Sequence, residues 1–72
     1  MKIILYKGLT CPQCKVITMK LEKKGIKFEP ITDTDYMLAH GIKTIPTLEV
    51  DGVRYLGVTA CNDWIKSYEV DA

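Results

Sequence analysis

The chain has 72 residues, of which 47% are hydrophobic and 26% charged, with three cysteines and a net charge of +1 at pH 7. One domain, residues 1–72, is the most that this length can form, and such a chain buries only about 60% of its unfolded surface. The composition excludes intrinsic disorder, and the length excludes an enzyme with a large enclosed cavity. Any chemistry must therefore be done by a few residues at the surface of a small fold.

The charges are unevenly distributed but give no reason to expect a polyanionic partner. Residues 1–27 hold seven lysines and one acid, whereas residues 28–72 hold three basic and eight acidic residues. Four lysines recur at the intervals of a solvated helix face: Lys15, Lys20, Lys23 and Lys24. We therefore expect a monomeric protein that binds neither nucleic acid nor a membrane.

No targeting segment is apparent. The apolar run of residues 3–6 is too short for a signal peptide or a membrane span. We expect a cytoplasmic protein with reduced thiols, and in that compartment cysteines are more often catalytic or metal-binding than structural. The odd number of cysteines indicates the same, because three cannot all pair within one chain.

The first part of the chain predicts a strand followed by a helix. Residues 3–6 form a continuous apolar run that is typical of a buried strand. A helix spanning about residues 12–24 follows, because Pro12 suits a first turn and Gly25 ends the helix. Its buried face carries residues at three- and four-residue spacing: Cys14, Ile17 and Leu21.

The middle of the chain predicts a short edge strand and a short helix. Phe28–Ile31 has the composition of a strand, and Pro30 favours a position at the edge of a sheet. A brief helix is expected over residues 34–40, with His40 at its C-terminal end. The segment between Ile31 and the proline at position 46 is short, so it forms either a helix of one or two turns or mostly a loop.

The last part predicts a hairpin and a helix. Asp51-Gly52 supplies the positive φ angles of a two-residue turn between the strands Thr47–Val50 and Val53–Leu56. The last helix is expected to begin near Thr59, which would act as its N-cap. One face of this helix carries Cys61, Trp64, Ile65 and Tyr68.

The predicted order is therefore β-α-β-α-β-β-α. The first two strands flank a helix and should be parallel, with a right-handed crossover, and the hairpin adds an antiparallel edge. The expected fold class is α/β, with a four-stranded mixed sheet and helices on both faces.

Chemistry is predicted at Cys11-Pro12-Gln13-Cys14, where the first strand leads into the first helix. The unsatisfied N–H groups and the positive dipole end of a helix N-terminus stabilise a thiolate at Cys11. Lys15 adds a positive charge one turn further on. Pro12 and Gln13 shape the turn and allow a small disulfide, with Cys14 on the inward side.

The chemistry implied by this pair is thiol–disulfide exchange. The Cys11 thiolate would attack a target disulfide, and Cys14 would then resolve the mixed disulfide and release the reduced target. The electrons must be resupplied from outside, so we expect no bound cofactor and no metal.

Two metal-binding alternatives use the same cysteines. Cys11, Cys14, Cys61 and His40 add up to the four ligands of a zinc site, although the usual second CxxC or His pair is missing. Gly8-Leu9-Thr10-Cys11 resembles the loop of small copper-carrying metallochaperones, and thiolates suit copper(I). That family needs the order β-α-β-β-α-β, whereas this chain is predicted to end in a helix.

Thr44-Ile45-Pro46, placed just before a strand, is the second informative motif. Together with the CxxC it makes the chain resemble the thioredoxin superfamily, and within it the glutaredoxins and the NrdH-type redoxins that serve ribonucleotide reductase. The resemblance covers nearly the whole chain and implies a thioredoxin-like fold. It also implies a cis Ile45–Pro46 bond, with Thr44, Ile45 and Pro46 contacting the backbone of the substrate.

The resemblance implies partners as well. They are a disulfide-bearing target protein, such as ribonucleotide reductase, and a donor that is either glutathione or NADPH acting through a thioredoxin-reductase-like enzyme. Glutaredoxins usually carry Lys or Arg where this chain has Gly8, with Lys7 one residue further back. Their Gly-Gly-acid stretch for glutathione is reduced here to Gly57 near Thr59. We therefore expect the reductase more than glutathione.

Four other positions have a structural and a functional interpretation. Tyr6 should end the first strand near the cysteines, although a strand aromatic is more often a core residue. Cys61 is either a further reactive thiol or, as we favour, a core cysteine. Val16 and Met19 form either an apolar docking patch or a contact with the last helix.

Overall fold

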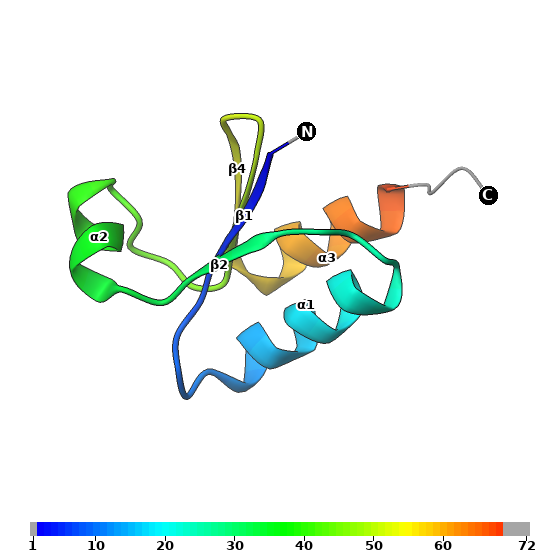
Figure 1. Cartoon of the computed structure of the whole chain (residues 1–72), viewed down its shortest axis with the longest axis horizontal. Coiled ribbons are helices and arrows are strands. Elements are labelled where there is room, and N and C mark those ends of the chain that lie inside the picture. The colour runs from blue at the N-terminus through cyan, green and yellow to red at the C-terminus, as the bar shows by residue number, and fades with distance from the viewer. Residues whose placement is uncertain (1, 69–72) are drawn as a thin grey trace.

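A four-stranded mixed sheet with the strand order β2-β1-β3-β4 forms the centre of the molecule (Figure 1). The computed structural model describes residues 2–68. Strand β1 (Ile3–Tyr6) pairs in parallel with β2 (Glu29–Ile31) and antiparallel with β3 (Thr47–Val50), and β3 pairs antiparallel with β4 (Val53–Leu56). The predicted chain order and the mixed sheet are confirmed, with β2 at one edge and β4 at the other.

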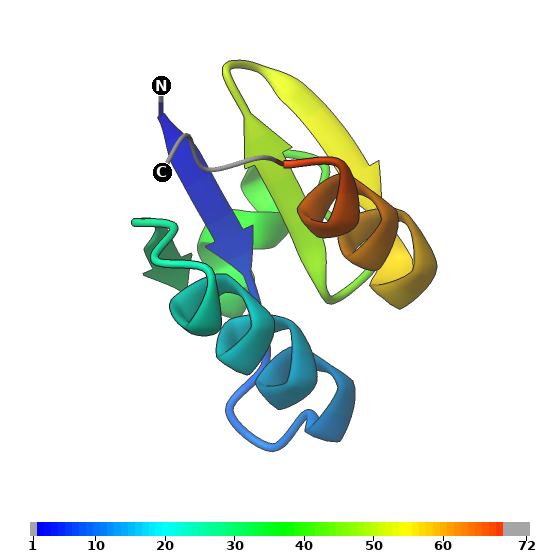
Figure 2. The ribbon, with the colours of Figure 1, turned by 90° about the vertical axis from the view of Figure 1, so that its right-hand side faces the viewer.

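Helices cover both faces of this sheet. Helices α1 (Pro12–Lys23) and α3 (Gly57–Ser67) lie side by side on one face, and the short α2 (Thr34–Ala39) lies on the other (Figures 1 and 2). None of the helices within residues 2–68 combines the length and the apolar character needed to cross a membrane.

Each face of the sheet has its own apolar core. Alternate residues of β1 point to opposite faces, because side chains alternate along a strand. Leu5 therefore packs with Ile17 and Leu21 of α1 in the larger core, which also receives buried side chains from β3 and α3. The smaller core on the α2 face consists of Ile4, Tyr6, Met37 and Ile42.

The local sequence explains most of the element boundaries. Helix α1 has Cys11 as its N-cap and ends before Gly25, whose φ of +71° suits a residue without a side chain. Helix α2 is capped by the Asp33 carboxylate, which accepts hydrogen bonds from two backbone N–H groups. The hairpin turn has positive φ angles at Asp51 and Gly52, as predicted.

The start of α3 differs from the prediction. The helix begins at Gly57, two residues before Thr59, and no side chain caps it. The N–H of Gly57 donates instead to the carbonyl oxygen of Pro46, at 2.9 Å. Thr59 is therefore not the N-cap, because a backbone contact with a distant loop replaces the side-chain cap that the sequence suggested.

Candidate active site

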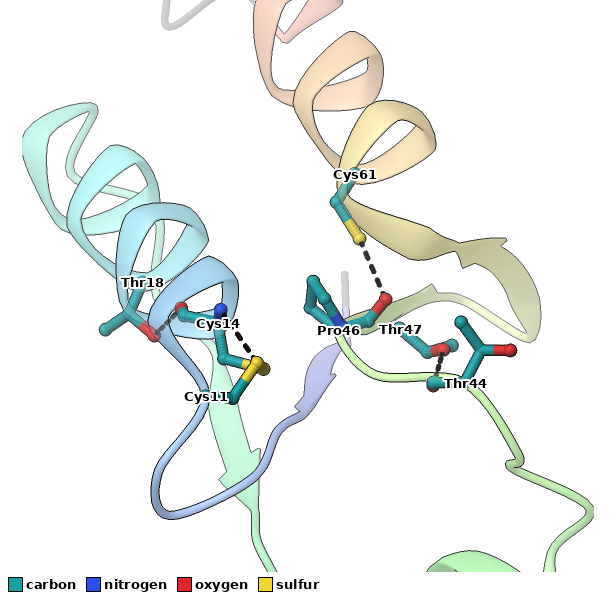
Figure 3. Close-up of a disulfide and its surroundings, with 7 residues drawn as sticks. All are labelled: Cys11, Cys14, Thr18, Thr44, Pro46, Thr47 and Cys61. Carbon is teal, nitrogen blue, oxygen red and sulfur yellow. Dashed lines mark hydrogen bonds between the residues drawn. A yellow bond between two sulfur atoms is a disulfide. The ribbon is translucent and has the colours of Figure 1, made fainter.

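The two cysteines of the CxxC motif form a disulfide at the start of α1 (Figure 3). Their Cα atoms lie 5.2 Å apart. The Sγ of Cys11 accepts a hydrogen bond from the backbone N–H of Cys14 at 3.2 Å. Cys14 is buried, whereas Cys11 is partly exposed. The pair therefore presents one sulfur to solvent and keeps the other in the protein, as the sequence predicts.

This placement determines which sulfur can act as a nucleophile. An N-cap side chain faces the free N–H groups of the first helical turn, so a thiolate on Cys11 would receive their hydrogen bonds and the favourable dipole. Pro12 occupies the first helical position without losing a hydrogen bond. Gln13 and Lys15 are exposed on the first turn, where the Lys15 charge lies close in sequence to the pair.

The loop before β3 lies opposite the disulfide. The Ile45–Pro46 peptide bond is cis, as the resemblance implies. In Figure 3 the Pro46 ring lies on the side of its loop that faces the cysteines. Pro46 is buried, whereas Thr44 and Ile45 are exposed. The hydroxyl of Thr47 donates to the carbonyl oxygen of Thr44 and ties the two ends of the loop together.

Cys61 lies behind Pro46, inside the larger core (Figure 3). Its side chain has no exposed surface, and its Sγ lies 3.4 Å from the carbonyl oxygen of Tyr55 and 3.7 Å from that of Pro46. Burial raises the pKa of the Cys61 thiol, which disfavours the reactive thiolate. The structure thus gives Cys61 the core position that we favoured over a second reactive thiol.

The remaining predicted residues, Tyr6, Lys7 and Thr59, occupy different parts of the fold. Tyr6 ends β1, but its ring belongs to the core on the α2 face, whereas Cys14 is a buried residue of α1, which packs on the opposite face. Burial, followed by the charge of Glu49, raises the pKa of the Tyr6 hydroxyl. Lys7 is half-buried and its N–H donates to Ile31, and Thr59 is exposed on the first turn of α3. Tyr6 is thus a core residue on the α2 face.

A hollow lies beside Gly8 that no sequence motif predicts. Its lining comes from two separate segments: Gly8 and residues 34–45. Only the folded chain brings these segments together, so no local motif signals the hollow. Val16 and Met19 are both exposed on α1, at 46% and 67%, which agrees better with a surface patch than with a buried contact.

The metal-binding alternatives find no support in this geometry. Among residues 2–68, no three His, Cys, Asp or Glu side chains are grouped in a way that could hold a metal ion. His40 lies at the end of α2, and its ring stacks on Tyr36 rather than approaching the cysteines. The chain order β-α-β-α-β-β-α also differs from the order that a copper metallochaperone requires.

No family model matches the sequence, and a search of curated proteins finds no match. Several solved structures nevertheless resemble the chain. NrdH-redoxin from Escherichia coli, a glutaredoxin-like protein with a thioredoxin-like activity profile, is 22% identical, with a TM-score of 0.75 over 100% of both chains. Glutathione transferase Omega 3C from Trametes versicolor is 19% identical, with a TM-score of 0.69 over 93% of this chain and 34% of the transferase. The chain therefore has the thioredoxin-like fold that the sequence predicted, over the full length of a glutaredoxin-like redoxin.

Proposed function

We propose that this protein is a dithiol–disulfide oxidoreductase that reduces disulfides in target proteins. The observation that carries the proposal is the Cys11–Cys14 disulfide at the N-terminus of α1, opposite a cis Ile45–Pro46 bond. One sulfur is accessible and the other is buried, so the two cysteines have different roles in the exchange. The exchange needs only the two cysteines and the cis-proline loop, and a chain of 72 residues contains all of these groups.

The reaction starts from the reduced protein. The Cys11 thiolate attacks one sulfur of the target disulfide, which forms a mixed disulfide and releases the other target sulfur as a thiolate that takes up a proton. Cys14 loses its proton, attacks the Sγ of Cys11 and expels the second target thiolate. The target gains two electrons and two protons, and the protein is left with the Cys11–Cys14 disulfide. A separate reductant must then return two electrons.

A thioredoxin-reductase-like flavoenzyme supplied by NADPH is the donor that we propose, in preference to glutathione. Gly8 stands where glutaredoxins usually carry a cation, and the Gly-Gly-acid stretch is incomplete at Gly57. The thioredoxin-like activity profile of the E. coli NrdH-redoxin agrees with this choice. Ribonucleotide reductase is the target that the NrdH resemblance suggests, and the cytoplasm is the proposed site of action.

Two variants test the mechanism. Cys11→Ser should abolish reduction of insulin disulfides, because the nucleophile is lost. Cys14→Ser should instead accumulate a mixed disulfide with the target, which mass spectrometry detects as an adduct removed by dithiothreitol. The two variants serve as matched controls, since each replaces one sulfur by oxygen. Turnover by Cys11→Ser at the wild-type rate would contradict the mechanism.

The choice of donor is tested with the wild-type protein. Turnover of insulin is measured as NADPH consumption with either thioredoxin reductase or glutathione plus glutathione reductase. We expect the first system to support the faster turnover. Faster turnover with glutathione would overturn the choice of donor while leaving the exchange mechanism intact.

A further inference from the structure

Helices α1 and α3 carry a surface on which apolar and basic side chains are combined. Two adjoining hollows form it. The first, of about 590 Å³, is lined by residues of α1 alone: Val16, Met19, Lys20, Glu22 and Lys23. The second, of about 170 Å³, shares Lys20 and Lys23 with the first and adds Lys24, Asn62, Ile65 and Lys66. We call the two hollows together the α1–α3 surface.

The α1–α3 surface is strongly basic. In the lining of the two hollows, four lysines stand against one acid, Glu22. In the whole chain, by contrast, ten basic residues stand against nine acidic ones. The surface therefore attracts acidic groups although the protein as a whole is close to neutral.

Val16 and Met19 form the apolar part of this surface. Both side chains are exposed, and together with Lys20 and Lys23 they follow the i, i+3, i+4, i+7 spacing of one helix face. The apolar pair is thus bordered by cations on the same helix. Uncovered apolar side chains with a polar border are typical of interaction sites.

The same residues indicate which kind of macromolecule fits. Nucleic-acid sites combine several free cations with aromatic side chains on which bases stack. Among the described residues, no aromatic side chain lines either hollow. Two of the four ammonium groups are already engaged, because Lys20 donates to the side chain of Asn62 and Lys24 donates to the Ile65 carbonyl oxygen at 2.7 Å. An acidic protein segment with an apolar side chain fits this surface better than a polyphosphate chain.

Helix α1 connects this surface to the reactive sulfur. Cys11 is the N-cap of α1, and the surface follows on the same helix from Val16 to Lys23. At a rise of 1.5 Å per residue, Val16 lies about 8 Å and Lys23 about 18 Å beyond Cys11 along the helix axis. One extended residue spans about 3.3–3.6 Å, so a chain bonded through Cys11 crosses this distance in about five residues.

We propose that the α1–α3 surface binds an acidic segment of the redox partner, in which Asp or Glu residues flank an apolar side chain. The apolar side chain packs on Val16 and Met19, and the carboxylates approach the exposed Lys23 and Lys66. The inference rests on the proposed oxidoreductase function and adds a class of partner to it. The segment lies within about five residues of the cysteine that is exchanged at Cys11.

The test uses symmetrical disulfides of capped peptides in which one glycine joins a cysteine to a tail of five residues. The tails are Asp-Asp-Leu-Asp-Asp, Asp-Asp-Ser-Asp-Asp and Ser-Ser-Leu-Ser-Ser, each placed either before or after the cysteine. Protein reduced with dithiothreitol and then desalted is mixed with each peptide at low salt, and chromatography gives the second-order rate constant. The readout is the ratio of the acidic Leu rate to the neutral Leu rate within each protein variant, which cancels differences in the fraction of active protein.

For at least one tail position, we expect this ratio to be about three- to tenfold higher in wild type than in Lys23→Glu, because the reversed charge repels the tail. Lys2→Glu is the matched control, since it makes the same charge change at an exposed lysine outside both hollows, and it should keep the wild-type ratio. The difference between wild type and Lys23→Glu should shrink as salt is raised to about 1 M. Met19→Ser should lower the rate on the acidic Leu tail and leave the rate on the acidic Ser tail unchanged.

The outcomes separate this inference from the function on which it rests. If wild type reduces none of the peptides, the proposed oxidoreductase function fails. If the ratio is the same in wild type and Lys23→Glu, the function stands and the docking role of the surface is overturned. An equal fall of the ratio in Lys23→Glu and Lys2→Glu also overturns it, because net charge then explains the effect. A stretch of oligothymidylate that slows exchange with the acidic peptide more than the cysteine-free acidic tail does, at equal negative charge, would assign the surface to nucleic acid instead.

Discussion

The thiol of Cys61 lies 3.7 Å from the carbonyl oxygen of Pro46, so a core side chain contacts the residue that faces the disulfide. The same oxygen accepts the N–H of Gly57 at 2.9 Å. Pro46 is therefore held from behind by the start of α3 while its ring faces the cysteines (Figure 3). The packing of α3 and the position of the cis-proline loop are thus linked through one carbonyl group.

The first prediction concerns the packing of Cys61. Cys61→Ala removes a fully buried sulfur and a weak donor to two carbonyl groups, so the free energy of unfolding should fall by about 1 kcal/mol. Urea denaturation of the oxidised protein measures the change. The exposed Thr59→Ala, on the same helix, is the control and should shift it by less than about 0.5 kcal/mol. Equal stabilities of Cys61→Ala and wild type would show that the sulfur contributes nothing.

A second prediction concerns stability at alkaline pH. Burial raises the pKa of the Cys61 thiol in the folded state, and the pKa of the Tyr6 hydroxyl is raised in the same way. Above the unfolded cysteine value of about 8.5 the unfolded chain therefore binds fewer protons than the folded chain, and the free energy of unfolding must fall as pH rises. The contribution is complete below that pH and is lost as pH increases through the folded pKa.

Denaturation of the oxidised protein at a series of pH values from 7 to 10 measures this loss. Because Cys11 and Cys14 do not titrate as a disulfide, Cys61 is the cysteine that remains to respond. Cys61→Ala should have a flatter profile than wild type between pH 8.5 and 10, since the two proteins differ only at this position. Parallel profiles would mean that Cys61 does not contribute to the loss of stability.

Sequence patterns predicted the site better than they predicted its surroundings. Cys11 and Cys14 belong to a short motif whose geometry depends mainly on local structure, namely a helix N-terminus, whereas the cis bond before Pro46 was implied by the resemblance to a known family. Their positions could therefore be predicted from the sequence. The thioredoxin-like order of elements also followed from local signals such as Gly25 and the Asp51-Gly52 turn.

What could not be predicted depends on contacts between distant segments. The run from Ile3 to Tyr6 is apolar throughout, so it carries no alternation that tells which side chain faces α1 and which faces α2. The side of the sheet on which the Tyr6 ring packs is for that reason set by the fold, although the interpretation of Tyr6 as a core residue agrees with the structure. The start of α3 depends on a bond to Pro46, eleven residues before Gly57, and a local cap at Thr59 was the wrong inference.

A third prediction uses the absence of a cation at Gly8. Gly8→Lys places an ammonium group near Cys11 and should raise the rate on glutathione disulfide about three- to tenfold through attraction of its carboxylates. Gly8→Ala introduces the same Cβ, which must displace the Cδ1 of Ile45, but no charge, and should show no such gain. The difference should shrink as salt is raised from about 0.01 to 1 M, because salt screens exposed charges. A gain that is independent of salt would rule out an electrostatic cause.

The last prediction concerns the contact between α1 and α3 on the far side of the molecule from the cysteines. The ammonium group of Lys24, just after α1, donates to the carbonyl oxygens of Ile65 at 2.7 Å and Tyr68 at 3.2 Å. These carbonyls belong to the C-terminal end of α3, where the helix dipole favours a cation. Lys24 thus joins the ends of two helices whose apolar faces share one core.

Lys24→Met keeps the apolar stem but removes the charge and its hydrogen bonds, so we expect the free energy of unfolding to fall by about 0.5–1 kcal/mol. The control is Lys27→Met, since Lys27 is exposed and its side chain makes no hydrogen bond within residues 2–68. Urea denaturation of the oxidised proteins at low and high salt measures both changes. The Lys24 effect should exceed the Lys27 effect at low salt and decrease as salt is added. Equal losses in both variants would indicate a general effect of net charge, and the contact with α3 would then carry no stabilisation of its own.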